Sequence, residues 1–205
     1  MLIRGLMGVY SMGMNKVAKR LAEQGFEATA ISGAIRAQEG RGLIEAAQAS
    51  ELPRPLVIAG HSYGGDAAVR LTRQLDRANV TVDTLILVDA TTPPPVPGNV
   101  REVFHIYRSS PGTDWVPVLR GVPINERRRK RDLPETHVIN FDLRKADAPE
   151  LKTAMINHFT IDASQAVQNL VVEQALAARE ESQQKPAPRN DATDAADSPC
   201  RLHLP

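Results

Sequence analysis

Residues 55–65 of the chain read PLVIAGHSYGG, an apolar run that leads directly into a glycine-rich turn. A short, continuous apolar run is typical of a strand covered on both faces in a parallel sheet. The segment after the turn, residues 67–77, has helical periodicity. Its apolar side is formed by Ala68, Leu71 and Leu75. The turn fits the pattern G-x-S-x-G, which requires a strand before it and a helix after it. The sequence therefore predicts a strand, a sharp turn and a helix, with Ser62 in the turn.

Ser62 is predicted to be a nucleophile, because such a turn holds its Oγ clear of the backbone. Gly60 and Gly64 remove Cβ atoms that would clash in the turn, and Gly65 lets the helix lie close to the sheet. The start of the helix then places backbone N–H groups and a partial positive charge beside the serine. The N–H of Tyr63 is accordingly the first predicted oxyanion donor.

A serine hydroxyl needs a base, and the five histidines can be sorted by position. His203 lies in the polar C-terminal segment, and the side chain of His61 is expected to point away from Ser62. His105 and His137 lie in or at the start of predicted strands, which favours structural roles. His158 follows the last predicted strand, in a loop that can reach back over the carboxyl edge of the sheet. His158 is therefore the predicted base.

The orienting acid has two candidates. Asp89 ends the strand that follows the predicted nucleophile helix, and Asp142 ends a later strand. A carboxylate at the carboxyl end of a buried strand points into the crevice where open α/β sheets bind ligands. Asp89 is the preferred acid and Asp142 the alternative; the order Ser…Asp…His holds with either.

A second oxyanion donor is expected from the loop after the first strand. Residues 4–13 read RGLMGVYSMG, and the glycines allow the backbone to approach a substrate closely. The N–H groups of Leu6 and Met7 are the candidates.

The rest of the body alternates short strands with helices, which predicts an α/β fold with a mostly parallel sheet. Gly25 suits the position just after a helix end. A folded domain is expected over residues 1–181, and the polar segment 182–205 is expected to be a flexible tail. Strands are predicted at 2–4, 27–31, 55–59, 84–88, 103–107 and 137–141, and helices at 15–24, 41–49, 67–77 and 163–178.

Composition excludes several classes of protein and several kinds of site. The chain has 205 residues, 42% hydrophobic and 24% charged, which is ordinary for a single globular domain. The net charge of +1 gives no electrostatic footprint for nucleic acid, so no nucleic-acid partner is expected. The single cysteine, Cys200, cannot form an internal disulfide or a paired-cysteine metal site. No apolar run approaches the roughly 20 residues that span a bilayer, and no signal peptide is visible.

Five features follow one another along the chain: the early strand, the RGLMG loop, the GHSYGG turn, Asp89 and His158. Together they resemble the α/β-hydrolase superfamily, and in particular small bacterial serine esterases, lipases and thioesterases. The resemblance covers roughly residues 1–180. It implies a compact three-layer sandwich, a Ser-His-Asp mechanism with an acyl-enzyme, and neither a metal nor an organic cofactor. The chain departs from the family in having no long insertion after the Asp89 strand, so no lid domain is expected. The acid position is similar to the one thioesterase domains use, which supports Asp89 over Asp142.

The resulting expectation is a serine hydrolase that cleaves a carboxylic ester or thioester of a small-molecule acyl substrate. The alternatives are a non-catalytic binding module of the same fold and an acyltransferase using the same residues. The protein is expected to be cytoplasmic as written, or exported to the periplasm if the true start lies upstream, since the chain opens almost inside its first strand. The basic run at 127–131 is expected to be a solvated loop. The oligomeric state is left open.

Overall fold

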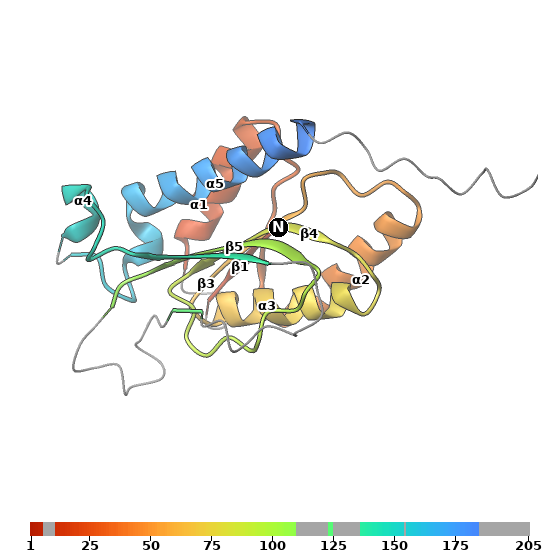
Figure 1. Cartoon of the computed structure of the whole chain (residues 1–205), viewed down its shortest axis with the longest axis horizontal. Helices are drawn as coiled ribbons and strands as arrows, with labels where there is room; N and C mark the ends of the chain where they lie inside the picture. Colours follow the sequence, from red (N-terminus) through yellow and green to blue (C-terminus); the bar gives the residue numbers. More distant parts are fainter. Residues whose placement is uncertain (6–10, 110–122, 125–135, 154, 185–205) are drawn as a thin grey trace, which may run out of the picture.

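The computed structural model describes residues 1–5, 11–109, 123–124, 136–153 and 155–184 (Figure 1). The predicted tail therefore lies almost wholly outside the described residues. The last helix runs to Gln184, three residues beyond the expected end of the domain. No helix in the described ranges is long and apolar enough to cross a membrane.

A six-stranded sheet forms the centre of the molecule, in the order β2-β1-β3-β4-β5-β6. Every neighbouring pair in this order is parallel, so the carboxyl ends of the strands lie along one edge. The parallel α/β sheet expected from the sequence is thus confirmed. The strands are β1 (Leu2–Arg4), β2 (Ala30–Ser32), β3 (Val57–His61), β4 (Val82–Val88), β5 (Val100–Tyr107) and β6 (His137–Asp142).

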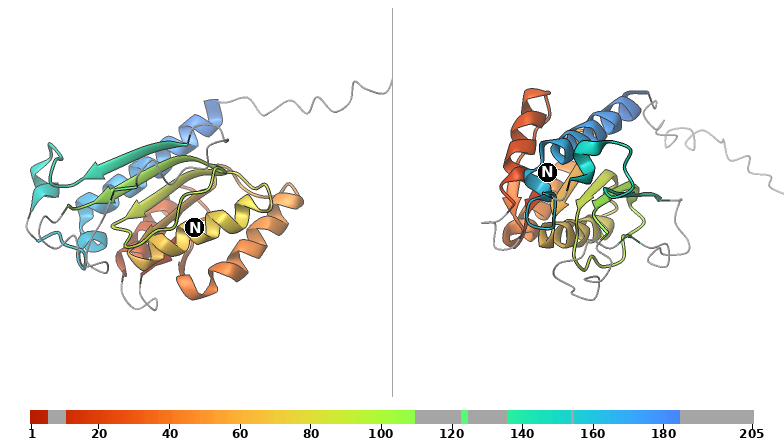
Figure 2. Two further views of the ribbon diagram at one scale, coloured as in Figure 1. Left: turned by 60° about the horizontal axis from the view of Figure 1, so that its bottom comes forward. Right: turned by 90° about the vertical axis from the view of Figure 1, so that its left-hand side faces the viewer.

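Helices cover both faces of the sheet and produce three layers (Figures 1 and 2). The chain moves outward from β1 to β2 and then returns past β1 to β3. Since crossovers between parallel strands are right-handed, this reversal places the helix between β1 and β2 on the opposite face from the helix between β2 and β3. One face carries α1 (Gly13–Glu23) and α5 (Gln165–Gln184), and the other carries α2 (Arg36–Gln48) and α3 (Tyr63–Asp76). Shorter helical segments are η2 (Gly33–Ile35), α4 (Pro149–Lys152) and η4 (Ile161–Ala163).

The central strands β3 and β4 are buried on both faces, which explains their continuous apolar sequence. Ala59, Ile86 and Val88 pack toward α1 and α5. Ile58 and Leu87 pack toward α3. Each such aliphatic side chain contributes about 1.5–3 kcal/mol relative to an exposed one. The two apolar layers fix the positions of the strand ends, where the candidate functional residues lie.

Several element boundaries differ from the sequence expectation for local reasons. Helix α2 begins at Arg36 rather than 41, because Ser32 accepts the N–H of Ala34 and starts the preceding 3-10 turn. Helix α3 begins at Tyr63 rather than 67, since the glycine-rich turn passes into the helix without a linker. The expected role of Gly25 agrees with its φ of 84° directly after α1.

The connection from β4 to β5, residues 89–99, is described throughout and contains no helix. This agrees with the expectation that no helical insertion follows the Asp89 strand.

Candidate active site

The turn between β3 and α3 holds Ser62 in a strained backbone conformation. Its φ is 56° and its ψ is −127°, a combination that costs a non-glycine residue about 1–3 kcal/mol. The backbone around Ser62 leaves no room for a side chain at Gly60 or Gly64. A Cβ on Gly60 would lie 2.3 Å from the Gly64 carbonyl oxygen, and one on Gly64 would lie 2.3 Å from the Ile3 carbonyl oxygen. The Ser62 N–H donates to the Val88 carbonyl at 2.9 Å, which anchors the turn to β4.

Three of the predicted site residues meet at the carboxyl edge of the sheet. Ser62 Oγ lies 2.9 Å from Nε2 of His158, and His158 Nδ1 lies 2.7 Å from Oδ2 of Asp89. All three side chains are buried or nearly so. With Nδ1–H donating to the carboxylate, Nε2 is free to accept the serine proton. The arrangement is that of a serine, a base and an orienting acid.

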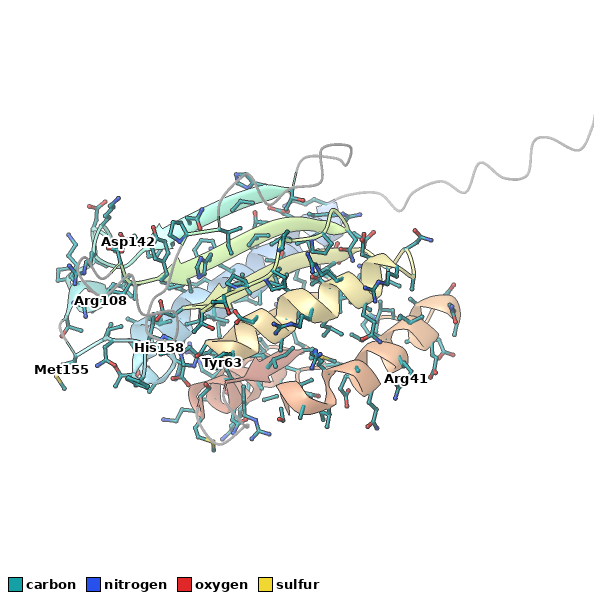
Figure 3. The ribbon with its side chains drawn as sticks, turned by 90° about the horizontal axis from the view of Figure 1, so that it is seen from below. Arg41, Tyr63, Arg108, Asp142, Met155 and His158 are labelled. Atoms are coloured by element: carbon teal, nitrogen blue, oxygen red, sulfur yellow. The ribbon has the colours of Figure 1, made fainter. Side chains whose placement is uncertain are left out.

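The fold explains why these residues meet. β3 and β4 are adjacent and parallel, so Ser62 and Asp89 emerge side by side, and His158 arrives from the loop before α5. Asp89 has a φ of 47°, and its N–H donates to the Ile106 carbonyl of β5 at 2.7 Å. Figure 3 shows Tyr63 and His158 at this end of the sheet, with Arg41 of α2 toward the other end.

The alternative acid, Asp142, accepts hydrogen bonds from the backbone instead. Its Oδ1 accepts the N–H groups of Ser109 at 3.2 Å and Arg144 at 3.1 Å. Asp142 therefore caps the turn after β6, whereas Asp89 makes the hydrogen bond with His158. The geometry favours Asp89 as the acid.

The predicted oxyanion donors are described only in part. Tyr63 is the first residue of α3, where N–H groups lack partners within the helix. Leu6 and Met7 lie outside the described residues. The residue before them, Gly5, passes close to Ser62: a Cβ on Gly5 would lie 3.6 Å from Ser62 Cβ and 2.5 Å from Ser11 Oγ. Ser62 thus lies between the ends of β1 and β3, where the direction of strand addition reverses. Open α/β sheets bind their ligands at such a switch point.

Part of the chain is similar to a known protein family. The sequence model of the thioesterase domain family matches residues 42–101, a range that contains both Ser62 and Asp89. The match covers less than a third of the chain. Together with the strand order and the strained serine turn, it supports the expected fold, a three-layer α/β sandwich that resembles the α/β hydrolases. The thioesterase match also supports a hydrolase over the other classes of protein.

Two further comparisons concern curated proteins and solved structures. None of the curated proteins compared with this chain matches it significantly. A similar solved structure is the crystal structure of a protein from Xanthomonas campestris pv. campestris, assigned to the hydrolases of the alpha/beta superfamily. It is 18% identical, the match covers 86% of this chain and 96% of that chain, and the TM-score is 0.43. The topology described above rests on the strands themselves and not on this likeness.

The remaining histidines of the hydrolase fold differ sharply in environment. His105 is fully buried on β5, and burial lowers its pKa to about 4. His137, at the start of β6, is exposed and lies 3.4 Å from a Glu102 oxygen. His203 lies outside the described residues. Neither His105 nor His137 contacts the Ser62 hydroxyl in any interaction of the described residues.

The ring of His61, which is expected to point away from Ser62, contacts two other residues near the candidate site. Its Nδ1 lies 2.6 Å from Ser11 Oγ, and its Nε2 lies 3.0 Å from the His158 carbonyl oxygen. The His61 and His158 rings are 5.6 Å apart between centroids. His61 does not contact the Ser62 hydroxyl in any interaction of the described residues, but it does contact the backbone of the candidate base.

Two residues that support the candidate site carry little sequence signal. Asp66 is buried in the first turn of α3, and its carboxylate accepts the hydroxyls of Thr91 and Thr92 and the N–H of Thr92. It ties α3 to the segment just after Asp89. Arg108 donates its backbone N–H to Asp89 Oδ1 at 3.4 Å and its guanidinium to the Ile156 carbonyl, beside His158. A charged residue on the apolar side of the 63–76 helix was the available clue to Asp66.

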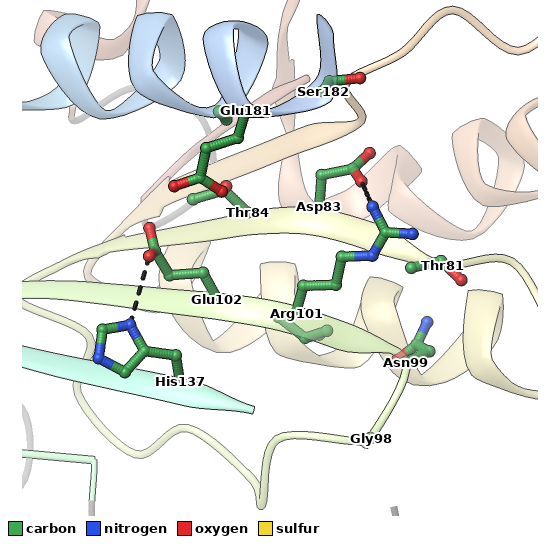
Figure 4. A pocket seen from close by; sticks show the side chains of 12 residues that line it. Thr81, Asp83, Thr84, Gly98, Asn99, Arg101, Glu102, His137, Glu181 and Ser182 are labelled. Atoms are coloured by element: carbon green, nitrogen blue, oxygen red, sulfur yellow. Dashed lines mark hydrogen bonds and ion pairs between the residues drawn. The ribbon is translucent and has the colours of Figure 1, made fainter. Parts of the chain in front are cut away.

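A polar groove lies at the opposite, amino edge of the sheet (Figure 4). Its volume is about 610 Å³, and it is lined by the starts of β4, β5 and β6 and the end of α5. Its charged side chains are largely paired: Arg101 lies 2.7 Å from Asp83, and His137 faces Glu102. Within the described ranges, no group of three His, Cys, Asp or Glu side chains is arranged to hold a metal ion.

Proposed function

We propose that this protein is a serine hydrolase that cleaves a carboxylic ester or thioester. One observation carries the proposal: the continuous hydrogen-bonded series from Ser62 through His158 to Asp89, with distances of 2.9 Å and 2.7 Å. A binding module has no need for a strained serine aligned with a base and an acid. The same residues would serve transfer to an acceptor other than water.

In the proposed mechanism, His158 Nε2 takes the proton of Ser62 as the serine Oγ attacks the substrate carbonyl carbon. The resulting imidazolium donates its proton to the leaving alcohol or thiol, and the C–O or C–S bond breaks. A water molecule then attacks the acyl-serine ester, giving its proton to His158. The Ser62 oxygen departs with that proton, and the free acid leaves. Asp89 holds the required tautomer and stabilises the imidazolium.

The negative charge on the carbonyl oxygen needs donors in both tetrahedral intermediates. We assign the first to the N–H of Tyr63 at the start of α3, and the second to the Leu6–Met7 segment that follows Gly5. Removing one such donor typically costs about 10²–10³ in rate.

Exposed apolar side chains beside the reacting groups support an acyl substrate. Phe159 is 73% exposed, and its ring lies edge-on to His158 with centroids 5.4 Å apart. Met155 of the same loop and Tyr63 beside Ser62 are also exposed. Such side chains would line the approach of an apolar acyl group. The thioesterase match supports a thiol as one class of leaving group.

The test is hydrolysis of p-nitrophenyl esters and acyl-coenzyme A thioesters of increasing acyl length, with Ser62→Ala as the key variant. We expect turnover by the full chain and its loss, by at least about 10³-fold, in Ser62→Ala. The matched control is Ser182→Ala, at the far end of α5 in the polar groove, which should retain wild-type turnover.

Labelling by a fluorophosphonate probe provides a second readout that is independent of the substrate. The probe should modify the wild-type protein at Ser62 and leave Ser62→Ala unmodified. A folded protein that neither turns over any substrate nor reacts with the probe is a binding module, and the proposal would then be wrong.

A further inference from the structure

We propose that His61 is a positioning residue that holds the candidate base, His158, in place by hydrogen-bonding its backbone and that links it to the segment after β1. The proposal rests on the function proposed above and extends it to a residue outside the Ser62, His158 and Asp89 series. It stands on four contacts of buried groups: Gly5 N–H to Ser11 Oγ at 3.0 Å, Ser11 Oγ to His61 Nδ1 at 2.6 Å, His61 Nε2 to His158 O at 3.0 Å, and His158 Nε2 to Ser62 Oγ at 2.9 Å.

The direction of these bonds follows from the donors available. A carbonyl oxygen can only accept, so the bond to His158 requires a proton on His61 Nε2. In a neutral ring Nδ1 is then the acceptor, and Ser11 Oγ, which accepts the N–H of Gly5, donates its own hydrogen to it. Burial lowers the pKa of His61 below its ordinary value; His158 acts in the same direction, and Asp162 opposes both. A neutral ring is the form that this arrangement requires, with one donor and one acceptor.

The loop that carries His158 is strongly bonded within itself but has few bonds to the body. Thr160 Oγ1 donates to the Met155 carbonyl and accepts the N–H of Asn157, and Asn157 Oδ1 accepts the N–H of Phe159. Besides the His158 side chain, the bonds that join it to the sheet edge come from Arg108 to the Ile156 carbonyl and from His61 to the His158 carbonyl. The His61 bond is therefore one of the few backbone links that position the His158 ring over Ser62.

The same contacts exclude a second nucleophilic site at Ser11. A serine and an acid must engage opposite nitrogens of the imidazole for a proton relay. Here Ser11 Oγ and Asp162 Oδ1 approach the same nitrogen, Nδ1, at 2.6 Å and 3.7 Å. The other carboxylate oxygen of Asp162 accepts the N–H of Gly13 at the start of α1. Ser11 is thus a structural partner of His61.

The test separates the two nitrogens of His61. In His61→Gln, the side-chain amide reaches the place of Nε2 and can still donate to the His158 carbonyl. In His61→Asn, the shorter amide reaches only the place of Nδ1 and keeps the bond with Ser11. Displacement of a catalytic group by about 1 Å costs up to about 10²-fold. We therefore expect kcat to fall about 10- to 100-fold in His61→Asn, with KM unchanged, and His61→Gln to recover most of that loss.

His137→Asn, at the exposed start of β6, is the matched control and should keep wild-type kcat. Equal losses in His61→Asn and His61→Gln would overturn the proposal, because they would show that the buried ring matters only for packing. Wild-type kcat in His61→Asn would overturn it as well.

A spectroscopic readout keeps this proposal distinct from the proposed function. Nitrogen-15 NMR of the imidazoles of the full chain should show His61 neutral at pH 7 with the proton on Nε2. A proton on Nδ1 would overturn the positioning role even in an active enzyme. Absence of all esterase and thioesterase turnover would instead contradict the proposed function and leave the tautomer measurement as the deciding test of the hydrogen-bond series.

Discussion

Asp89 and Asp142 show how much a single residue's role depends on where its strand ends. Both lie at a strand end, and both have buried carboxylates. Asp89 follows β4, which is next to the strand that leads into Ser62, whereas Asp142 is the last residue of the edge strand β6 and accepts the backbone N–H groups of Ser109 and Arg144. The position of the strand in the sheet, more than the residue type, distinguishes the two.

Exchange of each acid for its amide tests this assignment. Asp89→Asn keeps the shape but presents an amide to Nδ1 of His158, which favours the wrong tautomer, so we expect kcat to fall by about 10³–10⁴. Asp142→Asn keeps an oxygen for the two backbone N–H groups and should change kcat less than about threefold, because it does not alter the base. Steady-state kinetics on one ester substrate would measure both. A larger loss in Asp142→Asn than in Asp89→Asn would reverse the assignment.

The sequence allows some of these residues to be predicted and conceals others. Ser62 lies in a contiguous motif, and Asp89 and His158 follow from strand ends and chain order. The contacts of Ser11 with His61 and of Asp162 with Gly13 join segments 50 and 149 residues apart, so no local pattern marks them. The roles of Leu6 and Met7 stay predictions, since these residues lie outside the described part of the chain.

At the scale of elements, α3 and the end of β4 are joined by one buried carboxylate. Asp66 is 1% exposed and accepts from Thr91 Oγ1 at 2.9 Å and from the N–H and Oγ1 of Thr92 at 3.1 Å. Two faces of the site depend on this link, because α3 begins at the Ser62 turn and β4 ends at Asp89. Hydrogen bonds to Asp66 therefore hold the start of α3 to the segment after β4, and apolar packing holds the rest of the helix to the strand.

Removal of this tie should destabilise the protein. In Asp66→Ala, the buried Thr91 hydroxyl and the Thr92 N–H lose their acceptor, and unmet polar groups of this kind cost about 1–3 kcal/mol each. We expect the free energy of unfolding to fall by about 2–4 kcal/mol. Urea denaturation followed by circular dichroism would measure it, with the exposed Asp147→Ala as the matched control. Equal stability of the two variants would show that the tie contributes nothing.

The order and type of the elements could be predicted from the sequence, but their ends could not. The continuous apolar runs of β3 and β4 and the amphipathic pattern of α1 are strong local signals. The early start of α2 depends on the Ser32 cap, and the early start of α3 depends on close backbone contacts of Gly60 and Gly64. Both effects arise from three-dimensional contacts that periodicity does not record.

At the scale of the whole molecule, a buried histidine makes stability depend on pH. His105 lies on β5, between β4 and the edge strand β6, with no exposed surface, and burial lowers its pKa from the ordinary 6.5 to about 4. Below pH 6.5 the unfolded chain binds a proton that the folded chain refuses until about pH 4. Stability therefore decreases as the pH falls through this window and is unaffected by this group above it.

The expected size of this effect can be tested by substitution. Between pH 7 and pH 5, titration of His105 should lower the free energy of unfolding by about 2 kcal/mol. His105→Leu removes the titrating group while keeping an apolar side chain, so its stability should fall by about 2 kcal/mol less over the same interval. Urea denaturation at the two pH values would measure both proteins. Identical pH dependence in the two would contradict the assignment to His105.

The sequence distances between the three aligned side chains bear on when the site can form during synthesis. The contact between Ser62 and His158 spans 96 residues, and β3, α3 and β4 precede His158 in the chain. At about 5–20 residues per second, the ribosome adds His158 roughly 5–20 s after Ser62. A nascent chain would thus carry the serine turn, already bent by its own glycines, with no base beside it. Chains stalled before residue 158 should escape fluorophosphonate labelling, and labelling of such chains would show that the turn alone activates its serine.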